Sequence, residues 1–270
     1  MSGTISRIVV ALDAVSENRA AIVAAVRLAA QWNAPVHGVF VEDDDLLRLA
    51  VLPFARQVTL GFGVEALDVT QAERQLRAYA ERARRDLAEA ARASGIEWSF
   101  EIVRDTTVGV AAAATDFLVA GISTRPIDGH FRMQCRWWSV IEPSPASFLL
   151  AREGRLRGTI VGLLQRRGPD AERLLAVAAQ LAETAEARLT VIGPPELAGE
   201  EGFAAWLSQI LAGHRVQVEI SPTLSTPEAL IRQIGELDCR LLAIAADAAP
   251  PPEQLRDLVA RISCDVLVVR

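Results

Sequence analysis

The sequence of 270 residues contains no lysine, and all 28 of its basic side chains are arginines. This absence excludes Schiff-base chemistry and the lysine-dependent phosphate loop of P-loop enzymes, because both need an ε-amine. Aromatic residues make up only 5% of the chain, although 51% of it is hydrophobic. This balance favours helices packed closely on sheets. A chain this apolar, with 23% charged residues, is not disordered.

Cysteine is also scarce, and the three residues Cys135, Cys239 and Cys264 show no C-x-x-C spacing. Their odd number argues against a disulfide framework, and we expect Cys239 and Cys264, which each begin an apolar run, to be buried reduced thiols. No uncharged apolar stretch is long enough to cross a bilayer, and the N-terminus lacks the pattern of a signal peptide. We therefore expect a soluble, cytoplasmic protein without membrane insertion.

Neither the charge nor the motifs point to a nucleic acid or to catalysis. The net charge of −6 divides evenly, with −3 in residues 1–150 and −3 in residues 151–270, which argues against nucleic acid as a partner. The three histidines are widely spaced, and no G-x-S-x-G elbow or H-E-x-x-H motif occurs. We expect no catalytic residues, no metal site and no enzymatic activity.

Apolar runs and amphipathic stretches alternate along the first half of the chain. β-Branched runs of the kind found in buried parallel strands are followed by helical patterns. Gly95 is well placed to end the clearest helix. The predicted strands are 5–12, 36–41, 98–103, 117–120 and 146–151, and the predicted helices are 16–32, 68–94 and 108–114, with an irregular glycine-rich segment at 54–67.

The same order of elements then restarts, which places Ile8 and Ile160 in equivalent positions. The predicted strands of the second half are 158–164, 189–192, 216–220, 241–245 and 265–269, and its predicted helices are 169–186, 201–212, 227–236 and 253–262. Alternating strands and helices predict parallel sheets with right-handed crossovers. We expect two tandem open-sheet α/β domains, Rossmann-like with three α/β/α layers, at residues 1–153 and 154–270.

Ligands of open α/β sheets bind at the carboxyl ends of the strands, where the strand order reverses. In the first half this rule selects Asp13, residues 41–45 and the residues from Gly121 onward. In the second half it selects residues 165–168, Gly193 and the residues from Ala246 onward.

These residues resemble the universal stress protein family. The shared features are a first strand that ends in aspartate (IVVALD), a second strand followed by an acid (VHGVFVED), a long middle helix and a final strand that ends in arginine. The repeat makes the chain similar to a tandem, two-domain member. The resemblance implies a stress-response role and, in some members, ATP binding. It would place ribose- and adenine-side contacts at Asp13 and Val41, with Gly121 on the phosphate side.

The chain departs from the family's phosphate-binding signature of Gly, two residues, Gly, nine residues, Gly and Ser or Thr. Counted from Gly121, the next two signature positions are Thr124 and Gln134, and Gly129 stands at a different spacing. In the second half no glycine follows Gly235, and the loop 246–252 ends in three prolines, which supply no N–H donors. We expect no phosphate cradle in the second domain and no obligatory cofactor, with ATP or AMP in the first domain as the alternative.

Two further clusters have both a functional and a structural interpretation. The acids at 42–45 could bind a divalent cation or cap the helix predicted after them, and we favour the cap. Arg166 and Arg167 stand where a strand meets a helix N-terminus, which makes them a candidate anion site or two exposed loop arginines.

The segment 129–141 (GHFRMQCRWWSVI) concentrates histidine, cysteine, arginine and two tryptophans. Trp137 and Trp138 could stack on bases, but we favour a packing role against the sheet or at an interface, where tryptophan is enriched.

The leading hypothesis is a non-enzymatic regulatory or scaffold module that has lost ATP binding. It would pair its own two domains near their final strands, form a homodimer and bind a protein that the sequence does not identify. The alternatives are an adenine-nucleotide sensor that uses an altered loop from Gly121 to Gly129, and a slow ATPase.

Overall fold

The computed structural model describes residues 5–14, 18–42, 56–58, 64–66, 69–103, 113, 115–122, 144–153, 158–222 and 226–270. The chain divides into two compact units, Met1–Ser144 and Pro145–Arg270. This division precedes the strand near residue 150, whereas the sequence repeat places its boundary after that strand. The repeat boundary between residues 153 and 154 stays a prediction.

Unit 1 is built on a parallel sheet of four strands. Its strand order is β6-β1-β2-β5. The strands are β1 (Arg7–Leu12), β2 (Val36–Val41), β5 (Trp98–Val103) and β6 (Asp116–Gly121), and the helices are α1 (Asn18–Trp32) and α3 (Val69–Ala93). These bounds agree closely with the predicted elements, because the buried runs and the amphipathic stripe of α3 are strong periodic signals.

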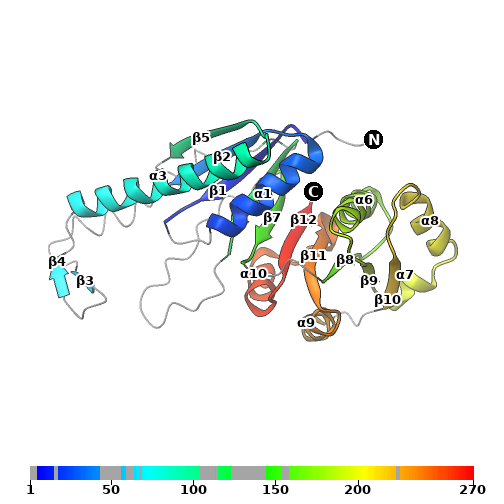
Figure 1. Ribbon diagram of the computed structural model, residues 1–270. Helices are drawn as coiled ribbons and strands as arrows, with labels where there is room; N and C mark the ends of the chain where they lie inside the picture. Colours follow the sequence, from blue (N-terminus) through cyan, green and yellow to red (C-terminus); the bar gives the residue numbers. More distant parts are fainter. Residues whose placement is uncertain are drawn as a thin grey trace. The chain divides into compact units, whose positions relative to one another are not determined.

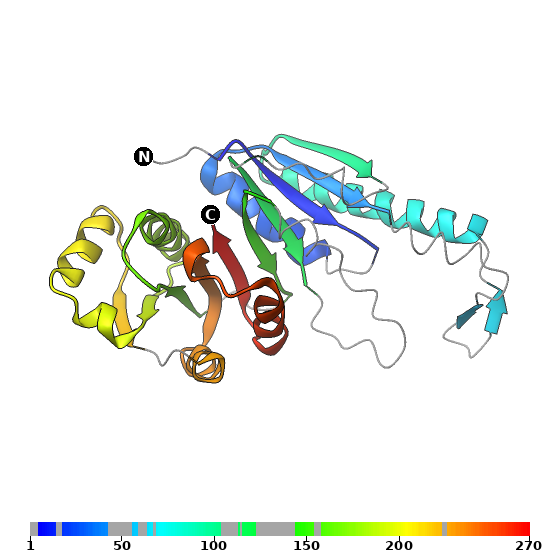
Figure 2. The ribbon, with the colours of Figure 1, turned by 180° about the vertical axis from the view of Figure 1, so that it is seen from behind.

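Helices α1 and α3 contact each other and cover one face of this sheet, as the two opposite views show (Figure 1, Figure 2). Helix α3 packs closely on β2 at Gly38, where an added Cβ would lie 2.5 Å from Cδ2 of Leu87 and 2.9 Å from Cδ2 of Phe100. The helix ends at Ala93, and Gly95, the predicted cap, follows with a left-handed φ of +65°. Glycine adopts this conformation without the penalty that a Cβ imposes.

The glycine-rich stretch 54–67 differs from its prediction as an irregular segment. It contains an antiparallel pair, β3 (Arg56–Val58) and β4 (Val64–Ala66), with Val58 opposite Val64. Gly61 and Gly63 lie between the two strands in the sequence. The predicted helix at 108–114 lies largely outside the described residues.

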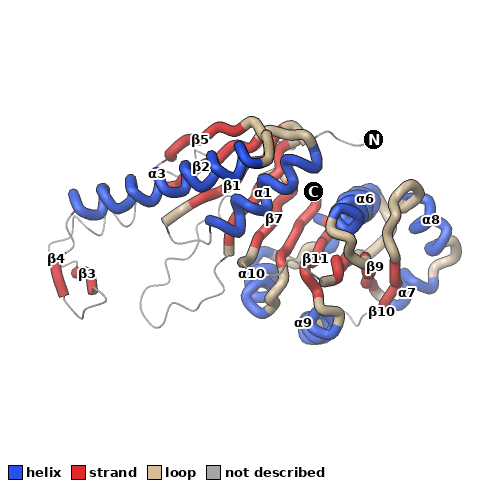
Figure 3. The backbone as a smooth tube through the Cα atoms, in the orientation of Figure 1, coloured by secondary structure: helices blue, strands red, loops and turns tan. Residues whose placement is uncertain are grey.

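Unit 2 contains a sheet of six strands in the order β10-β9-β8-β11-β12-β7. Its elements alternate along the chain as predicted (Figure 3). The strands are β7 (Ser147–Ala151), β8 (Thr159–Leu163), β9 (Leu189–Gly193), β10 (Val218–Pro222), β11 (Cys239–Ala245) and β12 (Asp265–Val269). The helices are α6 (Pro169–Thr184), α7 (Pro195–Gly199), α8 (Phe203–Ile210), α9 (Pro227–Glu236) and α10 (Pro252–Arg261), with a 3-10 turn, η1 (Ala246–Ala248).

The order of the unit 2 strands reverses at β8. From β8 the chain moves to β9 and then β10 on one side, and it returns to β11 and β12 on the other. Right-handed crossovers therefore place α6 and α8 on one face of the sheet and α9 and α10 on the other. Contacts between α6 and α8, and between α9 and α10, agree with this arrangement. Unit 2 thus has the α/β fold class and the three layers that the sequence predicts.

Strands β7 and β12 pair antiparallel, with Leu149 opposite Leu267. The sequence places β7 at the end of the first repeat and β12 at the end of the second. The expectation of parallel sheets is therefore wrong for this pair. Arg152 and Asp265 reinforce the contact, because the Arg152 amide donates a hydrogen bond of 2.8 Å to Asp265 Oδ1.

Candidate functional site

A pocket of about 330 Å³ lies at the carboxyl edge of the unit 2 sheet. Because β8, β9 and β11 are parallel neighbours, the residues that follow them meet at this edge, and β8 and β11 flank the point where the strand order reverses. The lining of the pocket comprises Leu163–Gln165 at the end of β8, Gly193 and Pro194 at the end of β9, Asp247–Pro251 after β11, and Thr226, Leu230, Gln254 and Leu258 from α9, α10 and their caps.

Half of these fourteen positions are ones that the strand-end rule selects in the sequence. The pocket includes Gln165, Gly193 and the loop after Ala245. Sequence reasoning missed the contribution of α9 and α10. The Thr-Pro pair at 226–227 is a helix-start signal that could have located the start of α9 beside the pocket. Thr226 does cap α9, because its side chain accepts a hydrogen bond from the Ala229 amide.

The loop after β11 offers few hydrogen-bond donors to an anion. Three of its seven residues, Pro250–Pro252, lack an N–H group, and the amide of Ala249 already donates to the Ala246 carbonyl at 3.3 Å. Asp247 further opposes an anion here, because it places a carboxylate in the pocket lining. The loop therefore offers few of the backbone donors that a phosphate cradle needs.

Arg166 and Arg167, the candidate anion site, are both engaged within unit 2. Arg166 Nε lies 2.8 Å from Asp247 Oδ2, and Arg167 Nε lies 3.0 Å from Glu200 Oε2. The Arg167 guanidinium also lies 5.5 Å from the ring centre of Phe203. The anion site stays a prediction, and an anion that bound there would compete with these two carboxylates.

In unit 1 the strand-end residues of the sequence prediction lie together at one edge of the sheet. Asp13 follows β1, Val41 ends β2 and Gly121 ends β6, and β1 lies between the other two strands. Asn18 holds the β1 end, since its side-chain amide accepts from the Asp13 N–H at 3.1 Å and donates to the Asp13 carbonyl at 2.7 Å. The ligand contacts of Asp13, Val41 and Gly121 stay a prediction.

Several predicted site residues lie outside the described part of the chain. They are Gly129, Trp137, Trp138 and the acids at 43–45. Glu42, the first acid of that run, is buried at 8% exposure, and its amide donates to the Val103 carbonyl. Among the described residues, no group of three potential metal ligands is present.

Asp265 and Cys264, which have shifted pKa values, lie at the amino end of β12, whereas the pocket lies at the carboxyl edge of the unit 2 sheet. Burial raises the pKa of Asp265 to about 6, against the opposing effects of the Arg152 amide and the Arg240 and Arg152 charges. A hydrogen bond from Cys239 is the main cause that lowers the pKa of the Cys264 thiol. Both cysteines are buried free thiols, as the sequence predicts.

Asp116, at the amino end of β6, shows the opposite shift from Asp265. Burial by itself would raise its pKa, but hydrogen bonds from Arg7, the Ala113 amide and Ser6 outweigh burial and lower it. Arg7 Nη2 and Ser6 Oγ both donate at 2.9 Å. This cluster ties the start of β1 to the start of β6, so its role is structural.

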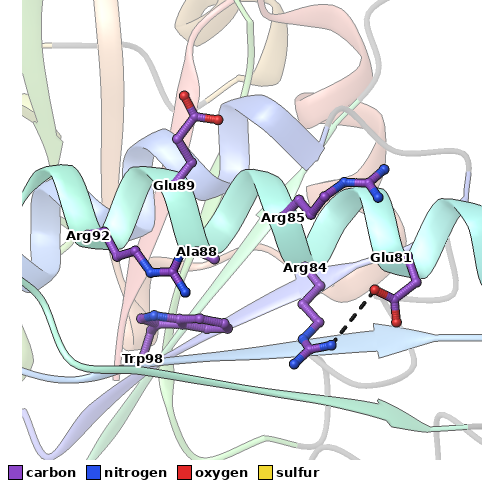
Figure 4. Close-up of a pocket in the computed structure, with 7 residues that line it drawn as sticks. All are labelled: Glu81, Arg84, Arg85, Ala88, Glu89, Arg92 and Trp98. Carbon is purple, nitrogen blue, oxygen red and sulfur yellow. Dashed lines mark ion pairs between the residues drawn. The ribbon is translucent and has the colours of Figure 1, made fainter.

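A second cavity, of about 490 Å³, lies on the surface of unit 1 between α3 and the start of β5 (Figure 4). Arg92 lies over the Trp98 ring, 5.8 Å from its centre, and Arg84 pairs with Glu81 at 3.8 Å. Glu89 points to the other side of the helix (Figure 4). Since Trp98 begins β5, this cavity lies at the amino edge of the parallel sheet, away from Asp13.

Comparison with known proteins identifies the fold. No family model matches the chain, and no curated protein matches it. Solved structures do. A universal stress protein from Archaeoglobus fulgidus DSM 4304 aligns with a TM-score of 0.63 at 14% identity, covering 97% of this chain and 96% of that one. A putative universal stress protein from Pseudomonas aeruginosa UCBPP-PA14 aligns with a TM-score of 0.54 at 16% identity, covering 99% and 94%.

A third similar structure is the cytoplasmic domain of a prokaryotic cation chloride cotransporter, with a TM-score of 0.51 at 12% identity, covering 97% of this chain and 94% of that one. At these identities the likeness concerns the fold. The chain therefore has the α/β fold of the universal stress proteins, which confirms the resemblance that the sequence suggests. No described helix combines the length and apolar character that a membrane span requires.

Proposed function

We propose that this chain is a non-enzymatic regulatory or scaffold module with the universal stress protein fold, and that it has lost canonical ATP binding. The observation that carries the proposal is the loop after β11. The prolines and the Asp247 carboxylate, none of which can donate to an anion, occupy the loop that the resemblance aligns with the family's phosphate-binding signature. Glycine-rich backbone, which supplies amides to phosphates, is missing there.

The cotransporter domain supports a module role. That protein carries the same fold as its cytoplasmic domain, so the fold occurs as one part of a larger protein. We propose by analogy that this chain acts in the cytoplasm by binding another protein or a second copy of itself. Its two units, which share the strand order around β1 and β8, would be a tandem repeat.

The test is a direct search for bound and binding nucleotide. Mass spectrometry of the denatured purified protein is expected to release no nucleotide, and calorimetric titration with ATP or AMP is expected to give no binding heat. A phosphate-release assay is expected to match the buffer blank. Micromolar binding that disappears in Asp13→Ala, but persists in the control Asp86→Ala on the exposed face of α3, would overturn the proposal.

That outcome would instead establish the second candidate, an adenine-nucleotide sensor in unit 1. The arrangement of Asp13, Val41 and Gly121 at neighbouring strand ends favours this candidate. Asp13 would hold the ribose, as the resemblance implies, and the altered loop after Gly121 would face the phosphates.

A further inference from the structure

We propose that the unit 2 pocket binds a small uncharged molecule with an apolar body. The inference deepens the proposed function and rests on it for one point, the absence of phosphate binding in unit 2. The position supports a ligand site, because the pocket lies where the order of parallel strands reverses. Its volume of about 330 Å³ falls at the small end of ligand pockets, which span roughly 300–1,000 Å³.

The walls of the pocket are mainly aliphatic. Leu163 comes from β8, Leu230 from α9 and Leu258 from α10, so that three elements each present a leucine to the same space. Pro194 and Pro250 add rigid apolar surface. Such walls stabilise the apolar body of a ligand in proportion to the area that they remove from water.

The charge of the pocket is balanced before any ligand enters. Among the described residues of the lining, Asp247 is the only ionisable one, and its side chain is 13% exposed. Arg166, whose side chain is 75% exposed, lies 2.8 Å from it and neutralises it from outside. An anionic ligand would meet the carboxylate, and a cationic ligand would have to displace Arg166. An uncharged ligand avoids both the repulsion by the Asp247 carboxylate and the displacement of Arg166.

Neutral hydrogen-bonding groups at the rim would fix such a ligand. Gln165 and Gln254 carry amides that both donate and accept. Thr226 Oγ accepts from the Ala229 amide at 3.3 Å, which leaves its O–H as a donor. One or two hydroxyl or amide groups on the ligand would match this set.

A series of probes that share a cyclohexyl body, and carry an uncharged, a cationic or an anionic polar group, tests the inference. The full-length protein, labelled at leucine methyl groups, is titrated at neutral pH with cyclohexanol, cyclohexylamine and cyclohexanecarboxylate. We expect cyclohexanol to shift the Leu230 and Leu258 methyl signals in a saturable manner, with at least tenfold weaker binding of the two charged probes. Ala249→Trp, which fills the pocket, should abolish the shifts, whereas Ala204→Trp on exposed α8 should preserve them.

If Ala249→Trp does not fold, Gln254→Trp at the exposed rim replaces it. Tighter binding of either charged probe would overturn the inference, and so would shifts that survive the filled pocket. Absence of shifts with all three probes would also overturn it, while leaving the proposed function intact. ATP or AMP that shifts these same methyl signals would overturn both, whereas nucleotide binding lost in Asp13→Ala concerns the proposed function alone.

Discussion

Arg166 and Asp247 form an ion pair across the point where the unit 2 strand order reverses, with Nε 2.8 Å from Oδ2. Arg166 follows β8, and Asp247 lies in η1 after β11. Two strands that are distant in sequence thus contribute opposite charges to one rim. The pair neutralises the Asp247 charge in the pocket lining. It leaves the pocket open, because the Arg166 side chain remains largely exposed to solvent.

This pair is expected to contribute little to stability. An exposed arginine loses side-chain freedom in the pair and is screened by salt, so a double-mutant cycle with Arg166→Gln and Asp247→Asn should give a coupling of about 0.2–1 kcal/mol. Urea denaturation of the four proteins measures it. The exposed pair Arg188–Glu219, at 3.6 Å, is a matched control that should give no larger value. Coupling well above this range would mean that the pair is more strongly desolvated than its exposure indicates.

Asp265 is expected to make stability fall as the pH rises. Its folded pKa of about 6 exceeds the ordinary 3.8, so the folded state keeps its proton in the interval where the unfolded state has lost it. Stability from this group is complete below about pH 4 and is lost by about pH 6, with a total of roughly 3 kcal/mol. Asp265→Asn cannot titrate and keeps an oxygen for the Arg152 amide.

The difference in unfolding free energy between Asp265→Asn and wild type should therefore move in favour of the variant between pH 4 and pH 7. Urea denaturation at several pH values measures this difference. A difference that is constant over the interval would show that Asp265 is not desolvated in the folded state.

Asp116 is expected to behave in the opposite sense. Its lowered pKa means that it stabilises the fold above the ordinary value of 3.8, and that this stabilisation is lost as the pH falls below it. Asp116→Ala would leave Arg7, Ser6 and the Ala113 amide without their shared acceptor, at a cost of about 2–4 kcal/mol. Glu219→Ala, which removes one partner of an exposed pair, should cost less than about 1 kcal/mol. Equal effects of the two substitutions in chemical denaturation would refute the structural role.

Two glycine-to-alanine substitutions should have opposite signs. Gly38→Ala places a methyl group 2.5 Å from Leu87 Cδ2 and forces α3 or its side chains to shift, at a cost of about 1–3 kcal/mol. Gly235→Ala lies in α9 where no atom is within 4 Å of the new Cβ, and it should stabilise the protein by about 0.4–1 kcal/mol. Thermal unfolding distinguishes them. A neutral Gly38→Ala would indicate looser packing of α3 on β2.

The helices and strands with strong periodic signals could be predicted almost to the residue. Helix α9 begins and ends as the sequence indicates, because Thr226 and Pro227 mark its start. The antiparallel pair of β3 and β4 could not be predicted from the sequence. Its strands of three residues are too short to show an alternating hydrophobic pattern. The residues of the candidate site likewise fall into a predictable and an unpredictable group. The strand-end rule finds Gln165, Gly193 and the loop after β11, but it does not find Leu230 or Leu258.

By itself the sequence determined the alternating α/β order, the likeness to universal stress proteins and the absence of glycine from the loop 246–252. These features are local, because hydrophobic period and residue type express them within a few positions. Only the tertiary structure decided that Asp247 faces Arg166, that Leu163, Leu230 and Leu258 share one pocket, and that β7 runs antiparallel to β12. These relationships join residues that are far apart in the chain, and strand order, which no local pattern encodes, brings them together.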